Sequence, residues 1–187
     1  MTEFVDTCYV TSPAHFGSRR HFYKKRLFPV TPYIRITSKS NDHLEDLVAR
    51  NVHVTPLIKK ELDKYQVLVQ EEFERQENGY KSLLDEHNDW LNTLFASMTV
   101  VEPTEDSEHV QQRFGEGKPS LADRELCAIA AYHGLHEPTT LYTRDRDMID
   151  LTQQMIKKNM VPRTTFQLYW ERGWQEEIIY GDKTFFQ

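Results

Sequence analysis

The chain has 187 residues, of which 39% are hydrophobic and 28% are charged. This is enough for one domain with its own core. No apolar run approaches the roughly 20 residues of a membrane helix, and the residues from Met1 to Asp6 do not resemble a signal peptide. We therefore expect a cytoplasmic protein with no membrane partner. The two cysteines, Cys8 and Cys127, lie in apolar segments and match no zinc spacing, so we expect reduced core thiols.

The formal net charge of −6 argues against a nucleic-acid partner, but the charge is unevenly distributed. Between Thr7 and Asn41 there are seven lysines or arginines and no acidic residue, so the rest of the chain carries all 29 acids against 16 bases. The same stretch is rich in aromatic residues. It is either a segment that binds nucleic-acid phosphates and stacks on bases, or a solvated basic loop whose aromatic residues pack on the core.

In chain order, the first element is an apolar run within Glu3 to Val10 that predicts a strand. Asp6 lies inside or at the end of it, and is either a turn residue or a metal ligand at the carboxyl end of a central strand. Residues 41–50 predict a helix capped by Asn41 or Asp42.

Residues 51–56 predict a short strand that leads into a further helix. Thr55 fits the cap of this helix and Pro56 its first position. Glu61 follows near the helix start, and taken alone it fits an exposed glutamate between lysines. Residues 65–97 predict two long helices with a break at Asn78-Gly79, and residues 98–101 a third strand.

Residues 102–118 are acidic and glycine-rich, which predicts a mobile loop. We expect this loop to lie over the edge of the sheet where the functional residues gather. The next predicted element is a helix that ends at Gly134. Ser120 fits its cap, and Asp123 lies in its first turn. Residues 139–142 predict a short buried strand, followed by a polar turn with Asp145 and Asp147.

The end of the chain predicts a helix over residues 148–158 and a last strand or edge over residues 161–167. The aromatic tail that follows either packs back on the domain or makes a homodimer contact.

Four acids have similar settings in this pattern, because each lies where a strand ends or a helix begins. They are Asp6, Glu61, Asp123 and Asp145. In a parallel sheet with helical crossovers all four approach one edge. Clustered carboxylates repel one another unless a cation binds among them. Oxygen ligands select hard ions such as Mg²⁺ or Mn²⁺.

Short motifs carry these acids. They are Val5-Asp6-Thr7, Thr55-Pro56 with Glu61-Leu62, Ser120-x-x-Asp123 before an alanine-rich helix, and Leu141-Tyr-Thr143-x-Asp145-x-Asp147. Together they resemble the PIN-domain ribonucleases of the PIN-like nuclease superfamily. The family usually has Asn where this chain has Cys8, and a thiol is not expected to replace the hydrogen bonds of an amide.

The resemblance implies an α/β fold, a three-layer α/β/α sandwich with a central parallel sheet. It implies a single PIN-like domain over residues 1–187, with a basic and aromatic insertion at about 11–40 and a helical hairpin inserted at about 66–97. The implied activity is that of a metal-dependent endoribonuclease, a hydrolase with Mg²⁺ or Mn²⁺ as cofactor.

The resemblance also implies roles for single residues. Asp6, Glu61, Asp123 and Asp145 would be catalytic. Asp6, Asp123 and Asp145 would hold the metal, with Asp147 as an auxiliary acid, and the hydroxyl of Thr143 would orient a carboxylate or a water. Single-stranded or structured RNA would be bound through the basic stretch. Its candidate contacts are Arg19, Arg20, Lys24, Lys25 and Arg26.

Several functional alternatives stay open. A nuclease of this kind could be an RNA-processing enzyme, or a toxin with an antitoxin-like protein inhibitor, although small toxin members of the family are shorter than this chain. The same acidic site could cut structured DNA. A third alternative is an RNA-binding protein with a degenerate, non-catalytic PIN-like site.

Overall fold

The computed structural model describes residues 1–11, 15–18, 32–75, 80–112, 120–157, 166–172 and 175–180. The strands of the main sheet are β1 (Thr2–Val5), β4 (His53–Val54), β5 (Thr99–Val100), β6 (Thr139–Thr143), β7 (Phe166–Arg172) and β8 (Gln175–Tyr180). A separate hairpin pairs β2 (His15–Ser18) with β3 (Pro32–Arg35). The helices are α1 (Thr7–Thr11), α2 (Ser38–Arg50), α3 (Pro56–Arg75), α4 (Tyr80–Ser97), α5 (Glu105–Gln112), α6 (Leu121–His133) and α7 (Arg146–Lys157).

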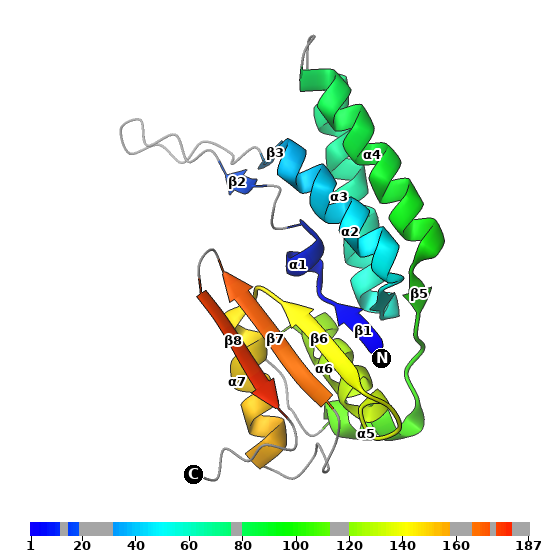
Figure 1. Cartoon of the computed structure of the whole chain (residues 1–187), viewed down its shortest axis with the longest axis vertical. Coiled ribbons are helices and arrows are strands. Elements are labelled where there is room, and N and C mark those ends of the chain that lie inside the picture. The colour runs from blue at the N-terminus through cyan, green and yellow to red at the C-terminus, as the bar shows by residue number, and fades with distance from the viewer. Residues whose placement is uncertain are drawn as a thin grey trace.

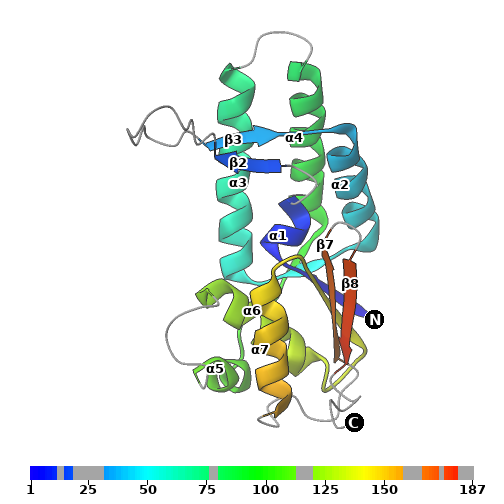
Figure 2. The ribbon, with the colours of Figure 1, turned by 90° about the vertical axis from the view of Figure 1, so that its left-hand side faces the viewer.

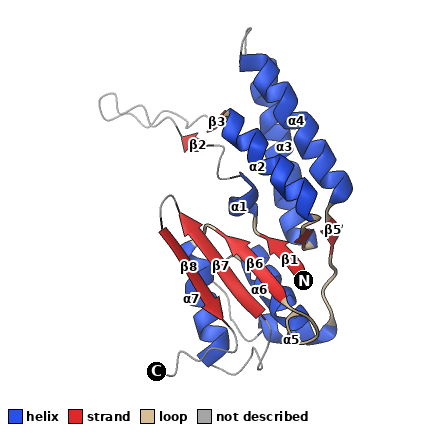
Figure 3. Cartoon of the chain, in the orientation of Figure 1, coloured by secondary structure: helices blue, strands red, loops and turns tan. Residues whose placement is uncertain are grey.

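The main sheet has the strand order β5-β4-β1-β6-β7-β8 (Figures 1 and 3). The first five strands in this order are parallel, and β8 pairs antiparallel with β7 at the edge. The predicted α/β class with a central parallel sheet is therefore confirmed, and the layers are compatible with a three-layer sandwich. The order of the strands reverses between β1 and β6, which makes this position the topological switch point of the sheet.

Helices α6 and α7 cover one face of the sheet (Figure 2). Four strand residues are fully buried on this face or in the adjoining core, namely Phe4, Leu141, Phe166 and Leu168. Among the described residues, no helix packs along the opposite face of β6, β7 and β8 (Figures 1 and 2).

Helices α2, α3 and α4 pack on one another and extend beyond the carboxyl edge of the parallel strands (Figure 1). Leu44, Leu84 and Leu91 fill the space between them. The predicted start of α3 is confirmed, since the helix begins at Pro56 and the hydroxyl of Thr55 accepts from the backbone N–H of Ile58 at 3.5 Å. The predicted pair of long helices on either side of residues 76–79 is also confirmed.

A buried polar network also joins the three helices of this bundle. The Nδ1 atom of His87 in α4 lies 2.7 Å from Oδ1 of Asn41 in α2, and its Nε2 lies 2.8 Å from the hydroxyl of Tyr65 in α3. Because the amide oxygen can only accept, Nδ1 carries the proton and Nε2 accepts from the tyrosine.

Two helix starts bear on the sequence-based expectations. Helix α2 is capped by Thr37, which forms a capping box with Ser40, and not by Asn41 or Asp42. Asn41 instead points into the bundle and binds His87. Helix α6 is capped as predicted, by Ser120 with Asp123 in a capping box and with Gly134 at its C-cap.

The prediction of a loop over residues 102–118 is wrong for Glu105–Gln112, which forms α5 and packs against α6. Thr104 and Ser107 exchange side-chain to backbone hydrogen bonds at its start, with donor–acceptor distances of 3.2 and 2.8 Å. Acidic residues fill the first turn, where the helix dipole favours them.

The two ends of the chain also differ from expectation. The first strand ends at Val5, and residues 7–11 form α1, so the expected strand up to Val10 is too long. The last strand predicted over residues 161–167 is β7, which begins at Phe166 and pairs with β8, so this part of the aromatic tail packs back on the sheet.

None of the helices in the described ranges combines the length and apolar character that crossing a membrane requires. The five candidate RNA contacts from Arg19 to Arg26 lie outside the described residues.

Candidate active site

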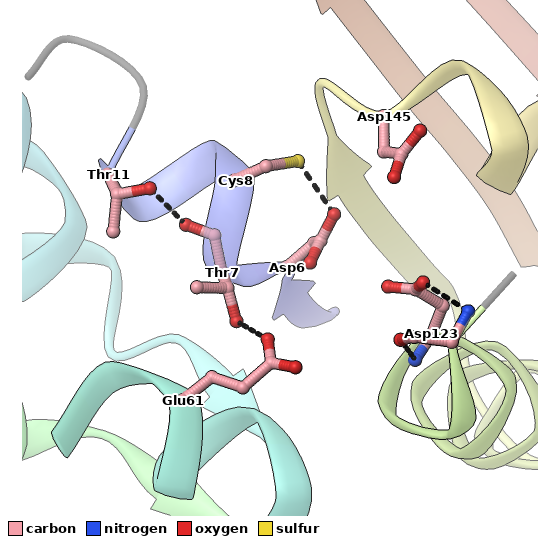
Figure 4. A pocket seen from close by; sticks show the side chains of 8 residues that line it. Asp6, Thr7, Cys8, Thr11, Glu61, Asp123 and Asp145 are labelled. Carbon is pink, nitrogen blue, oxygen red and sulfur yellow. Dashed lines mark hydrogen bonds between the residues drawn. The ribbon is translucent and has the colours of Figure 1, made fainter. Parts of the chain in front are cut away.

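One open pocket of about 280 Å³ lies at the carboxyl edge of the sheet, at the switch point between β1 and β6 (Figure 4). It brings together the four acids expected from the sequence. Asp6 directly follows β1, Glu61 lies in the second turn of α3, Asp123 in the first turn of α6, and Asp145 shortly after the end of β6. The other described residues that line it are Thr7, Cys8, Thr11 and Ser120.

Asp6 is the most buried of these acids, with 3% of its surface exposed. Its Oδ2 accepts hydrogen bonds from the hydroxyl of Thr143 and from the thiol of Cys8, both at 2.7 Å. Burial raises the pKa of Asp6 to about 6. The thiol and hydroxyl partly oppose this rise, and the charges of Asp123 and Asp145 add to it.

Asp123 is held by its own helix start. Its Oδ2 accepts from the backbone N–H of Ser120 at 2.9 Å, and its backbone N–H donates to the Ser120 hydroxyl at 3.2 Å. Burial raises the pKa of Asp123, hydrogen bonds to its carboxylate from the side chain and the backbone of Ser120 lower it, and the charges of Asp145 and Glu61 raise it further. These acids therefore lie close enough to disfavour each other's ionisation.

Glu61 is positioned from two directions. Its Oε2 accepts from the hydroxyl of Thr7 at 2.6 Å, which ties α3 to α1. One turn earlier on α3, the backbone N–H of Leu57 donates to Oε1 of the buried Glu125 at 3.2 Å. Because Glu125 follows Asp123 on α6, this bond fixes the helix that carries Glu61 against the helix that carries Asp123.

Thr143 connects two of the acids. Its hydroxyl donates to Asp6 and accepts from the backbone N–H of Asp145 at 3.0 Å. Oδ1 of Asp145 accepts in turn from the backbone N–H of Asp147 at 2.9 Å. Asp147 lies in the first turn of α7, and its side chain is not among those that line the pocket.

Cys8 contributes to the site in a way that the sequence reasoning missed. Its thiol donates to Asp6, and its sulfur accepts from the backbone N–H of Arg144 at 3.2 Å. Both cysteines are free, as expected. The thiol therefore does make hydrogen bonds between the end of β1 and the turn after β6, contrary to expectation. Burial raises the pKa of Cys8, so the group stays a thiol at neutral pH.

The electrostatics of the pocket are one-sided. The described residues that line it include four carboxylates and no lysine or arginine. Within the described ranges, no group of three or more His, Cys, Asp or Glu side chains is arranged to hold a metal ion. Mg²⁺ usually keeps several of its water ligands when it binds to a protein. Such an ion suits an open pocket, because most of the carboxylates can contact it through these waters.

Comparison of the chain with protein-family models, with curated proteins and with solved structures gave no match. The functional conclusion therefore depends on the residues of the site.

Proposed function

We propose that the protein is a metal-dependent nuclease of the PIN-like class that hydrolyses RNA phosphodiester bonds. The observation that supports it most is the pocket itself, in which Asp6, Glu61, Asp123 and Asp145 come from four separate elements and meet at the switch point of the sheet. Open α/β sheets bind ligands at this position. The four motifs that resemble the PIN-domain ribonucleases contain the same acids.

The donor set fits a hard divalent cation. All four acids offer oxygen ligands, and the raised pKa values of Asp6 and Asp123 reflect burial and mutual repulsion that a cation would relieve. Asp6, Asp123 and Asp145 would hold Mg²⁺ or Mn²⁺, some directly and some through water, with Asp147 outside this group. Such an ion activates water and stabilises negative charge on a phosphodiester.

The other residues have positioning roles in this proposal. Thr143 and Cys8 saturate Oδ2 of Asp6 with hydrogen bonds, so that Oδ1 is the oxygen left for a ligand. Thr7 holds Glu61 at the edge of the pocket, where its carboxylate can orient an attacking water. The basic residues from Arg19 to Arg26 would bind the RNA backbone.

A cleavage assay tests the proposal. We expect the wild-type protein to cut single-stranded RNA with Mn²⁺ or Mg²⁺ and to stop when EDTA is added. Asp6→Asn and Asp145→Asn should each lower the rate at least a hundredfold, since removing one group that stabilises developing charge typically costs about 10²–10³. The matched control is Asp85→Asn, an exposed acid on α4. Retained cleavage in both pocket variants would overturn the proposal.

Metal binding can be measured separately from cleavage. Calorimetric titration with Mn²⁺ should show saturable binding to the wild type and its loss in Asp123→Asn. The cleavage assay with single-stranded RNA and branched DNA side by side distinguishes a ribonuclease from a DNA nuclease. RNA binding without metal-stimulated cleavage would instead indicate a degenerate site, although the hydrogen bonds of Cys8 remove one argument for degeneracy.

A further inference from the structure

The two faces of the main sheet differ at β6 and β7. On the face that α6 and α7 cover, Leu141 and Leu168 are fully buried. Side chains alternate along a strand, so Tyr142, Gln167 and Tyr169 point to the opposite side, and they are half-buried.

We call this side of β6 and β7 the open face, because none of the described helices packs along it (Figures 1 and 2). Tyr9 of α1 and Arg50 of α2 contact it at Tyr142, near the end of β6. Parallel sheets usually have apolar residues and helices on both faces.

Aromatic rings form a row on the open face. Tyr142 and Tyr169 are register partners on neighbouring strands, and their ring centroids lie 5.4 Å apart. Tyr9 of α1 lies against the end of the row, with its ring centroid 5.3 Å from that of Tyr142, but only 6% of its surface is exposed, so Tyr142 and Tyr169 are the rings that a base can reach. Aromatic residues side by side on adjacent strands are a known way for a sheet to stack unpaired bases.

Two arginines lie over these rings. The guanidinium carbon of Arg50 lies 4.3 Å from the centroid of Tyr142, and that of Arg144 lies 5.3 Å from the centroid of Tyr9. Each is held by a carboxylate, Arg50 by Glu3 at 2.6 Å and Arg144 by Glu171 at 2.9 Å. Because each positive charge is matched by a negative one, the open face suits the faces of bases better than it suits phosphates. A duplex hides those faces, so the matching partner is single-stranded.

The row of rings begins beside the acidic pocket. Tyr142 directly precedes Thr143, whose hydroxyl donates to Asp6. Arg144 lies between Thr143 and Asp145, and its backbone N–H donates to Cys8. We propose that the open face binds the unpaired bases of the RNA strand whose phosphodiester lies in the acidic pocket. This inference rests on the proposed nuclease function and names the part of the substrate that is bound next to the site.

The test measures the Kd for a fluorescein-labelled oligouridine by fluorescence anisotropy. The titration contains EDTA so that no cleavage occurs. We expect Tyr169→Leu to raise the Kd about tenfold, which matches the loss of stacking on one base. Tyr169→Phe keeps the ring and should bind as the wild type does. The matched control is Tyr132→Leu, because Tyr132 is a half-buried tyrosine of α6 with a ring contact to His136. An unchanged Kd in folded Tyr169→Leu overturns the proposal.

A second measurement uses the unaltered protein, so it does not depend on how a variant folds. An oligouridine with 5-iodouracil crosslinks under light to aromatic side chains in contact with it. We expect crosslinked peptides that contain Tyr142 or Tyr169. Crosslinks confined to other peptides would overturn the proposal.

These results separate the open face from the nuclease function. If Asp123→Asn loses cleavage while Tyr169→Leu binds oligouridine as tightly as the wild type, the open face has no such role and the nuclease proposal stands. If the wild type cuts no RNA but Tyr169→Leu binds it more weakly, the nuclease proposal fails and the open face still binds RNA. If the wild type sediments as a dimer and Tyr169→Leu as a monomer with unchanged RNA affinity, the face belongs to a second copy of the chain.

Discussion

Asp6 is a buried carboxylate whose ionisation is unfavourable in the folded, metal-free protein. Burial, together with the nearby acids, raises its pKa from 3.8 to about 6. The folded protein therefore holds this proton more tightly than the unfolded chain does. The contribution of Asp6 to the free energy of unfolding falls as the pH rises from about 4 to about 6, and stays low at higher pH. At 1.36 kcal/mol per pKa unit, the loss is about 3 kcal/mol.

We therefore predict that Asp6→Asn stabilises the metal-free protein. Asparagine has the same shape and stays neutral, so at pH 7 the free energy of unfolding should rise by up to about 3 kcal/mol. At pH 4 the gain should nearly vanish, because Asp6 is then protonated. Urea denaturation in EDTA at both pH values measures this. Asp85→Asn is the exposed control, and a gain independent of pH would contradict the prediction.

Thr7 provides a prediction about positioning. Its hydroxyl donates to Glu61 at 2.6 Å, and Thr7→Val removes this bond with little change in shape. If the protein is a nuclease, cleavage should fall about tenfold because Glu61 is no longer held in one orientation, while the free energy of unfolding changes by only about 1 kcal/mol.

Thr11→Val is the matched control for Thr7→Val. Thr11 lies on the same helix and lines the same pocket, but its hydroxyl donates to the backbone carbonyl of Thr7 and not to a carboxylate. Equal losses of cleavage in both variants would indicate that the integrity of α1, and not the bond to Glu61, determines the rate.

The positions of the four acids could be predicted because strand ends and helix starts are marked in the sequence by apolar runs and caps. Their partners could not. The sequence predicts Cys8 within a strand, whereas α1 turns its thiol towards Asp6. The bond from Thr7 to Glu61 joins residues 54 positions apart, and no local pattern indicates such a contact.

At the scale of elements, the network of Asn41, His87 and Tyr65 makes the helical bundle sensitive to acid. Burial lowers the pKa of His87 from 6.5 to about 4. The unfolded chain then binds this proton more tightly than the folded one, so the free energy of unfolding falls as the pH drops from about 6.5 to about 4. This loss, about 3 kcal/mol, is opposite in direction to the effect of Asp6 over nearly the same range.

We predict that His87→Leu lowers the free energy of unfolding at pH 7 by about 1–3 kcal/mol, because it leaves Asn41 and the Tyr65 hydroxyl buried without this partner. The difference from the wild type should shrink as the pH falls to 4, since the variant has no histidine to protonate there. Urea denaturation across this range measures the difference. His109→Gln, an exposed histidine on α5, is the control, and a constant difference would contradict the prediction.

The elements themselves were predictable where caps and periodicity agree, as in α3 and α6. Helix α5 was missed because its acidic composition suggested a loop, although Thr104 and Ser107 form a cap. The start of α2 was misplaced because Asn41 is a good cap residue in general, and only the bundle shows that His87 binds it.

At the scale of the whole molecule, the charge is strongly divided. Seven basic residues and no acid lie between Thr7 and Asn41 in a chain with a net charge of −6. Replacing Arg19, Arg20, Lys24, Lys25 and Arg26 by glutamine should weaken RNA binding and flatten its dependence on salt. The slope of log K against log salt should fall by about 0.7 for each phosphate that the variant no longer binds.

Anisotropy titrations at several salt concentrations measure this slope. The control variant replaces Lys60, Lys64 and Lys81, which are exposed on α3 and α4. A slope that changes equally in both variants would show that the charge of the whole surface, and not the basic stretch, attracts RNA.

The central place of β1 has a consequence for synthesis on the ribosome. This strand precedes the other described strands of the sheet in the chain, and it pairs with β4 on one side and with β6 on the other, where Phe4 lies opposite Leu141. Until β6 has emerged, Asp6 has neither Thr143 nor Asp145 beside it. The pocket is therefore assembled only late in translation, because pairings of this sequence separation form after local ones. A nascent chain stopped before β6 would lack the assembled acidic pocket.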